Sequence, residues 1–263
     1  MTDLEREKRT RQHIIGIRLA IQSRESISSI TMSFPAGRIN VLVIAPHFDD
    51  ELIGCAGVLA EHVKRDQPCS VLYLTNGKGR NQQQYDSDIR KREARLGLEH
   101  LGDVRSLYFD IPDGELAGNP HYRQHLVSEL VSNHYERIYF PNPEDSYSDH
   151  AYAGEFLSFA LHAIGQTPEL YAYEIIEPMK FPNIYFEMSC YCSIKAKALK
   201  EHVSQHQYLD YTKISLEINK LRGEQLKCGD SEMYRRFSLV DLQKFYQMAS
   251  KRKADRQYQI VSS

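Results

Sequence analysis

The sequence predicts an α/β protein built on an open, doubly wound and mostly parallel sheet. Strand-length apolar runs alternate with helix-length amphipathic segments from residue 40 to residue 176. The segment Asn40–Pro46, NVLVIAP, is a nearly continuous β-branched run, which is typical of a parallel strand buried on both faces. The composition, 41% apolar and 26% charged over 263 residues, is that of an ordinary globular protein and excludes a disordered or fibrous one.

The individual elements follow from apolar spacing and from the turn residues between them. Residues 3–24 are expected to form a polar helix with a thin apolar stripe. Gly102 and Gly165 stand where a glycine commonly ends a helix. In the alternating part, the expected strands are 40–46, 70–75, 106–109, 137–140 and 170–176, and the expected helices are 51–64, 88–101, 122–135 and 151–164. Further helices are expected at 193–205, 211–226 and 239–249.

These elements are interpreted as a single domain over residues 1–263, because no stretch rich in Pro, Gly or Ser separates them. The domain comprises an N-terminal helix and lead-in (1–38), an α/β core (39–176) and a mostly helical C-terminal extension (177–263). Ligands of such sheets bind outside the carboxyl ends of the strands. Polar residues that directly follow a strand are therefore the first candidates for a functional site.

Charge and cysteine content narrow the function classes. The 33 basic and 35 acidic residues give a net charge of -2, so no strong field favours nucleic acid. The longest apolar stretches are shorter than the ~20 residues of a membrane span. The N-terminus is charged and Arg18 interrupts its apolar patch, which argues against a secretory signal. Five irregularly spaced cysteines predict reduced thiols and a cytoplasmic protein.

A first cluster of ionisable residues, His47-Phe48-Asp49-Asp50-Glu51, follows the strand 40–46. His47 and Asp50 are three residues apart, a spacing that can bring an imidazole and a carboxylate onto one metal ion across a tight turn. The alternative is an ordinary helix N-terminus, where acids cap the helix and complement its dipole. Capping does not explain an imidazole placed directly after a buried strand.

A second cluster, Asn142–His150, follows the strand 137–140 and ends in Asp149-His150 before a helix. Two parallel strands would thus deliver histidines and acids to the same edge of one sheet. Two His and one carboxylate with open positions are typical of a catalytic metal site, which suits zinc in a hydrolase and can also hold iron(II). The alternative is again a capped helix.

Taken together and in order, these motifs resemble the PIG-L/LmbE family of zinc-dependent N-acetylglucosaminyl deacetylases. The resemblance runs from about residue 39 to 165, with a weaker similarity to about 206, and implies a Rossmann-like fold. It rests on His47–Glu51, Gly54 and Gly57, Leu74–Gly77, Arg90-x-x-Glu93 and Asp149-His150.

The resemblance also implies a reaction, in which the N-acetyl group of an N-acetylated amino-sugar conjugate is hydrolysed to acetate and a free amine. The conjugate could be a lipid, nucleotide, thiol precursor, antibiotic or oligosaccharide. Zn²⁺ is the implied metal, and other divalent ions can substitute for it. By position in the motifs, the implied zinc ligands are His47, Asp50 and His150, the general base is Asp49, the substrate contacts are Arg90 and Asp113, and the residue that orients a ligand is Asp149.

The sequence departs from the family at two positions. Phe48 stands where proline is usual, and Tyr147 stands where many members have a catalytic histidine. We expect the Tyr147 phenol to assist the oxyanion as a hydrogen-bond donor, with Asp49 returning its proton to the leaving nitrogen. The competing hypothesis is a non-catalytic sugar- or nucleotide-binding protein on the same fold.

A group of basic residues between 78 and 95 has two interpretations. It could meet a phosphate or diphosphate on the substrate, or it could be a solvated helix face. No Gly-x-Gly-x-x-Gly follows the first strand, which weakens a dinucleotide interpretation. The group consists of Lys78, Arg80, Arg90, Arg92 and Arg95.

Overall fold

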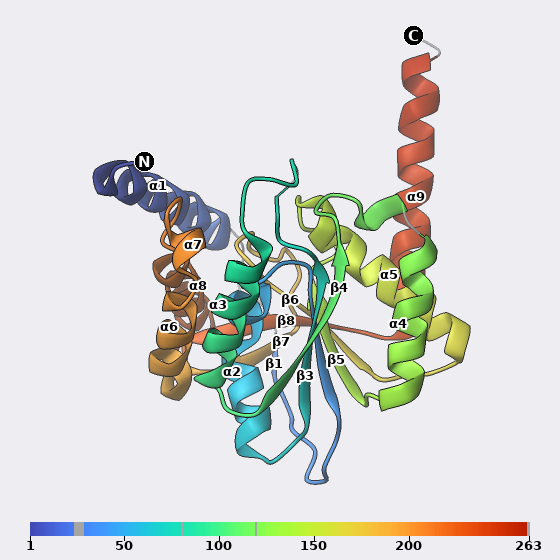
Figure 1. Ribbon diagram of the computed structural model, residues 1–263, viewed down its shortest axis with the longest axis horizontal. Coiled ribbons are helices and arrows are strands. Elements are labelled where there is room, and N and C mark those ends of the chain that lie inside the picture. Colours follow the sequence, from blue (N-terminus) through green and yellow to red (C-terminus); the bar gives the residue numbers. More distant parts are fainter. Residues whose placement is uncertain (24–28, 80, 119, 262–263) are drawn as a thin grey trace.

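An eight-stranded mixed sheet runs through the centre of the computed structural model (Figure 1), which describes residues 1–23, 29–79, 81–118 and 120–261. The strand order is β1-β7-β8-β6-β5-β2-β3-β4. Neighbours from β6 to β4 are all parallel, whereas β8 runs antiparallel to both β6 and β7. The strands are β1 (Ile30–Thr31), β2 (Val41–Ala45), β3 (Cys69–Thr75), β4 (Val104–Ile111), β5 (Arg137–Pro141), β6 (Glu169–Tyr173), β7 (Ile184–Glu187) and β8 (Ser231–Phe237).

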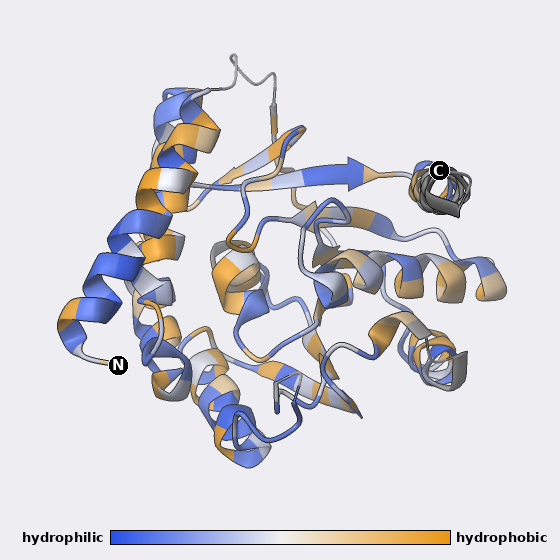
Figure 2. Ribbon diagram, turned by 90° about the horizontal axis from the view of Figure 1, so that it is seen from above, coloured by the Kyte–Doolittle hydropathy of each residue, from blue (hydrophilic) through white to orange (hydrophobic). Residues whose placement is uncertain are grey.

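Helices cover both faces of this sheet (Figure 1). One face carries α2 (Asp50–Lys64), α3 (Ser87–Glu99), α6 (Cys192–Lys200) and α8 (Tyr211–Leu226), and the other carries α4 (Pro120–Asn133), α5 (Ser148–Ile164) and α9 (Leu239–Val261). The short helix α7 (Val203–His206) precedes α8. Helix α1 (Asp3–Gln22) runs along one edge of the molecule, where Figure 2 shows its apolar residues scattered among polar ones.

The buried character of β2 explains why it is the central strand. All five of its side chains have no exposed surface. Val41, Val43 and Ala45 enter the core beneath α2 and α3, while Leu42 and Ile44 enter the core beneath α4 and α5. Successive side chains of a strand point to opposite faces. A continuous apolar run is therefore what a strand between two helical layers requires.

The chain reverses its direction across the sheet between β2 and β5. It passes from β2 outward to β3 and β4, then crosses back so that β5 pairs with the other side of β2. The loops that follow β2 and β5 therefore open beside each other at the carboxyl edge, at the topological switch point where ligands of such sheets bind. His47 lies in the first loop, and His150 lies in the first turn of α5, directly after the second.

The predicted fold class is confirmed, and so is the αL glycine that ends α5, Gly165 with φ 66°. The prediction for residues 177–263 missed β7 and β8, which complete the central sheet, and the two-residue β1 was missed as well. Strand β8, SEMYRRF, looks polar because its charged residues find partners far away in the sequence. The predicted helix 193–205 is divided near His202 into α6 and α7.

Two further properties bear on the predictions. Within the described ranges, none of the helices combines the length and hydrophobicity needed to cross a membrane. All five cysteines are free thiols, as the irregular spacing predicted.

A buried ion pair joins the C-terminal elements to α2. Lys195 of α6 and Glu232 of β8 are 0% and 1% exposed, and their charged atoms lie 3.0 Å apart. Lys195 also donates to the carbonyl oxygen of Ile53 at 2.7 Å. Glu232 accepts the backbone N–H groups of Gly57 and Val58 at 2.9 and 3.0 Å. The position of α2 therefore depends on residues far along the chain.

Lys195→Met should destabilise the protein by about 3–5 kcal/mol, because it leaves the Glu232 carboxylate buried without its cation. Urea unfolding measures this change. The matched control is Arg95→Met, which removes an exposed pair with Glu99 and should cost no more than ~1 kcal/mol. Equal losses of unfolding free energy in the two variants would contradict a larger contribution from the buried pair than from an exposed one.

Candidate metal centre

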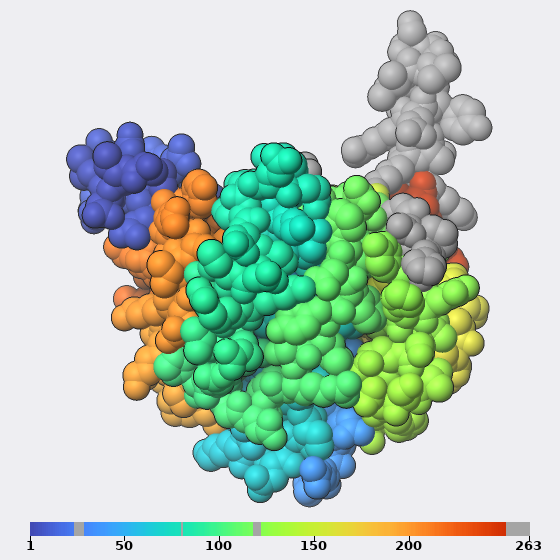
Figure 3. Space-filling model, in the orientation of Figure 1, coloured from blue at the N-terminus to red at the C-terminus, as the bar shows by residue number. Residues whose placement is uncertain are grey.

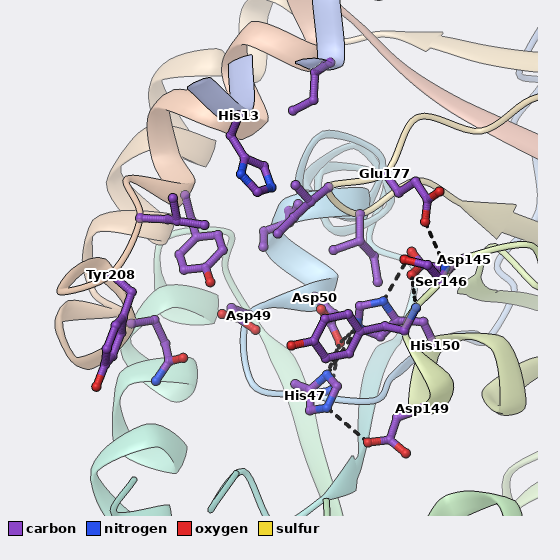
Figure 4. Close-up of a pocket in the computed structure, with 18 of the residues that line it drawn as sticks. His13, His47, Asp49, Asp50, Asp145, Ser146, Asp149, His150, Glu177 and Tyr208 are labelled. Atoms are coloured by element: carbon purple, nitrogen blue, oxygen red, sulfur yellow. Dashed lines mark hydrogen bonds and ion pairs between the residues drawn. The ribbon is translucent and has the colours of Figure 1, made fainter. Parts of the chain in front are cut away.

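Three ligand atoms converge where the loops after β2 and β5 meet (Figure 4). His47 Nδ1 lies 3.2 Å from Asp50 Oδ2 and 3.2 Å from His150 Nε2, and His150 Nε2 lies 3.4 Å from Asp50 Oδ2. A tetrahedral ion with bonds of about 2.0–2.2 Å separates its ligand atoms by about 3.3–3.6 Å. The triangle therefore matches three corners of such a coordination sphere, and the donor set of two imidazoles and a carboxylate fits a divalent metal.

Each histidine of the triangle has a carboxylate behind it. His47 Nε2 lies 3.4 Å from Asp149 Oδ2, and His150 Nδ1 lies 3.3 Å from Asp145 Oδ2. Such carboxylates fix the ring orientation and raise the basicity of metal-binding histidines. Asp149 is placed as the resemblance implied and also accepts the N–H of Gly114 at 2.8 Å. Asp145 was not among the predicted site residues, although it is one of three acids in the segment 142–150.

The electrostatics of the triangle favour positive charge. Burial opposes ionisation of Asp50, but the neighbouring His150 and hydrogen bonds from both histidines outweigh it and hold the pKa of Asp50 well below its usual value. Burial also opposes protonation of the histidines. Their carboxylate partners outweigh it and raise the pKa of His47 to about 9 and that of His150 to about 10. The surrounding carboxylates thus stabilise a cation here, whether protons or a metal ion.

Asp49 occupies the N-cap position of α2, but its side chain makes no capping hydrogen bond. Its backbone φ is 146°, a conformation that costs a non-glycine residue about 1–3 kcal/mol. Its Oδ1 lies 3.5 Å from Arg90 Nη2, and Figure 4 places it beside Asp50 in the cavity. Burial and the charge of Asp50 outweigh Arg90 and raise the pKa of Asp49 to about 7. The capping alternative does not describe this side chain.

Arg90 is almost buried, and its guanidinium binds protein groups. It donates to the carbonyl oxygens of Gly77 and Phe48, both at 3.1 Å, and its Cζ lies 5.4 Å from the Tyr85 ring centroid. The second member of the motif, Glu93, accepts the backbone N–H and the hydroxyl of Ser204 at 2.9 and 2.6 Å. The Arg-x-x-Glu motif therefore ties together segments that line the cavity.

The other predicted site residues also lie around this cavity. Asp113 lines it and accepts the N–H groups of Gly77 and Gly79 at 3.0 and 2.6 Å. Tyr147 is 56% exposed, and its ring stacks on that of His150 with centroids 5.2 Å apart. Phe48 has no exposed surface and packs on Tyr73, so the residue that replaces the usual proline belongs to the core.

The basic group between residues 78 and 95 does not form a phosphate site in the part of the chain that the structure describes. Of its described members only Arg90 lines the cavity. Lys78 and Arg92 are exposed, and Arg95 pairs with Glu99 on the outer side of α3. Arg80 lies outside the described residues.

Comparison with known families decides what kind of domain surrounds this centre. Residues 42–161 match the PIG-L family, described as GlcNAc-PI de-N-acetylase, and this range contains all three ligand residues. This segment is a PIG-L family domain. The resemblance stated from the sequence motifs is thereby confirmed.

Solved structures of similar fold support the same architecture. The N,N'-diacetylchitobiose deacetylase of Pyrococcus horikoshii has a TM-score of 0.65 at 19% identity, covering 76% of this chain and 84% of its own. The 4-carboxy-2-hydroxymuconate hydratase of Pseudomonas putida has a TM-score of 0.66 at 18% identity, covering 75% and 95%. A conserved protein of Thermus thermophilus reaches 0.67 at 23% identity, covering 75% and 94%. Because a deacetylase and a hydratase share it, the fold alone does not fix the PIG-L domain's reaction.

Purified protein should bind about one divalent ion per chain, and His47→Ala or His150→Ala should abolish that binding. Asp145→Ala and Asp149→Ala should weaken metal affinity by about 10–100-fold, because each removes the carboxylate that orients a ligand. Elemental analysis and competition with a chelating dye measure both effects. Glu99→Ala, an exposed acid on α3, is the control. Unchanged affinity in all four site variants would rule out this centre.

Proposed function

We propose that the protein is a zinc-dependent N-deacetylase that hydrolyses the N-acetyl group of an N-acetylated amino-sugar conjugate to acetate and a free amine. The observation that carries this proposal is the convergence of His47, Asp50 and His150 in one cavity that Asp49 also lines. The PIG-L family match over the same residues supports it.

The residues divide the chemical work between them. A metal ion held by His47, Asp50 and His150 supplies Lewis acidity toward the acetyl carbonyl and makes water a better nucleophile. Asp49 is not part of the triangle, so its carboxylate is free to act as general base. It accepts a proton from the attacking water and returns it to the departing nitrogen.

Tyr147 is proposed to assist the oxyanion. Its ring rests on His150 and borders the cavity, which keeps the phenol next to the triangle. A phenol is a hydrogen-bond donor at neutral pH, but it brings no positive charge. The phenol would thus replace the hydrogen bond of the usual histidine and leave proton delivery to Asp49.

The backbone of Asp49 speaks against the non-catalytic alternative. A protein that only bound a sugar would gain stability from glycine at a φ of 146°, and it would have no use for a buried carboxylate there. Backbone strain of this kind gathers at active sites, where the geometry of a reactive group matters more than local stability.

Asp49→Asn should lower deacetylation at least ~100-fold while the metal stays bound, because it removes the general base and no ligand. Acetate and free amine released from N-acetylglucosamine and its glycosides measure turnover, and elemental analysis measures the metal. Asp88→Asn, an exposed acid on α3, should keep full activity. Loss of the metal in Asp49→Asn, or its full activity, would contradict the assigned role. Wild-type protein that releases no acetate would contradict the proposed reaction.

Arg90→Ala separates two roles of this side chain. The sequence suggested a substrate contact, whose loss would mainly raise KM. The contacts with Asp49, Gly77 and Phe48 instead predict that kcat falls by about 10²-fold, since a general base displaced by an ångström loses its alignment. Arg92→Ala on the exposed side of the same helix is the control. A raised KM with unchanged kcat would restore the substrate contact.

A further inference from the structure

The cavity that contains the triangle is much larger than the metal centre. Its volume is about 940 Å³, which lies at the upper end of the ~300–1,000 Å³ typical of small-molecule sites. Besides the loops that carry the ligands, its walls include residues 175–178, residues 205–211 and helix α1. All three of these segments lie outside the family match at residues 42–161.

Helix α1 presents one continuous face to the cavity. The lining residues are Arg9, Gln12, His13, Gly16, Ile17 and Ala20, a spacing of three and four residues that places them along one side of a helix. His13 projects into the cavity in Figure 4. In Figure 3, α1 lies in dark blue against the orange surface of the C-terminal helices.

The α1 wall is fixed in place by packing and polar contacts. Ile17 and Ile21 form a small buried cluster with Ile214, Ile218 and Leu221 of α8. Arg18 pairs with Glu217 of α8 at 2.5 Å, and the hydroxyl of Thr10 accepts the N–H of Asp210 at 3.1 Å. Because these contacts fix α1 in place, the helix can select ligands by their shape.

The chemistry of this wall differs from that of the metal end. Ile17 of α1 shares the apolar lining of the cavity with Ile53, Ile175, Pro178, Leu209 and the ring of Tyr211. The cavity's aspartates lie in the loops after β2, β4 and β5 and in the first turns of α2 and α5. Glu177 also lines the cavity, and its carboxylate accepts the backbone N–H of Ser146, in the loop after β5, at 2.8 Å. Helix α1 instead contributes Arg9 and His13. The charge of Arg9 contributes to the lowered pKa of Glu5, one turn earlier in the helix. Within the described residues, no ion pair shorter than 4.0 Å involves Arg9.

We propose that the α1 side of the cavity binds the aglycone of the substrate, and that this aglycone is an apolar group carrying an anionic substituent recognised by Arg9 and His13. The inference rests on the proposed function, because it assumes that the N-acetyl group lies at the triangle. A carboxylate and a phosphate can each accept hydrogen bonds from the Arg9 guanidinium and the His13 imidazole, and the substrates below distinguish them.

Gly16 gives a direct test of occupancy. A Cβ added at Gly16 would meet no atom within 4 Å, so a side chain can begin there without a clash. Because Gly16 lines the cavity, we expect the ring of Gly16→Trp to occupy its α1 side. The control is Ile15→Trp, which adds the same ring at a 52% exposed position that does not line the cavity. Both variants are assayed on N-acetylglucosamine and on its 4-nitrophenyl β-glycoside. Wild type and Ile15→Trp should prefer the glycoside at least tenfold in kcat/KM, and Gly16→Trp should bring that ratio to about one.

The anionic substituent is tested with the 4-carboxyphenyl and 4-phosphonooxyphenyl β-glycosides. Arg9→Glu should lower kcat/KM at least tenfold more on the preferred anionic glycoside than on the nitrophenyl one. Arg11→Glu, an exposed arginine of the same helix that does not line the cavity, should not change this ratio. The larger Arg9→Glu effect on one of the two glycosides identifies carboxylate or phosphate as the recognised group.

Equal kcat/KM for N-acetylglucosamine and every glycoside in the wild type would overturn this inference and leave the deacetylase proposal standing. Matching behaviour of Gly16→Trp and Ile15→Trp would do the same. If the wild type releases no acetate at all, calorimetric titration with the same glycosides tests the wall by itself. Binding that Gly16→Trp abolishes and Ile15→Trp keeps supports an aglycone site, and absence of binding to wild type overturns it.

Discussion

The carboxylate of Asp50 is the group around which the centre is organised. Its Oδ2 accepts the backbone N–H of His47 at 2.8 Å and lies within 3.4 Å of both imidazoles. Asp50 is also the first residue of α2, so any shift of that helix moves the oxygen on which the two histidines converge. The accuracy of the centre therefore depends on the accuracy with which α2 is seated.

Close packing and buried charge seat α2. A Cβ on Gly54 would come within 2.2 Å of the Tyr173 ring, and one on Gly57 within 2.8 Å of Met188, so these glycines let the helix approach β6 and the region after β7. Lys195 and Glu232 in addition bind backbone groups of the helix itself. The family-matched segment thus supplies the ligands, while later residues fix the helix that carries one of them.

Strong local signals allowed much of this arrangement to be anticipated. The run NVLVIAP had to be a strand buried on both faces, and parallel order then forced His47 and His150 to the same edge. Strand β8 was not predicted, because the partners of its Glu232 lie in α2 and α6, and no local sequence pattern reveals such distant partners. The role of Asp145 was not predicted, because only the folded loop shows which of its acids lies beside His150. The contribution of α1 to the cavity was not predicted, because polar side chains look the same in a sequence whether they face bulk water or a cavity.

The placement of β8 has a consequence for the order in which the protein can assemble. This strand lies between β6 and β7, although it follows both in the chain. When residues up to 226 have left the ribosome, the chain already contains the metal ligands, α2 and Lys195. It still lacks Glu232, the partner of Lys195, and with it strand β8, which lies between β6 and β7. The metal ligands lie at residues 47–150, but the buried ion pair that helps to hold their supporting helix is complete only when residues 231–237 have been made. Of the described elements, only α9 follows this strand in the chain.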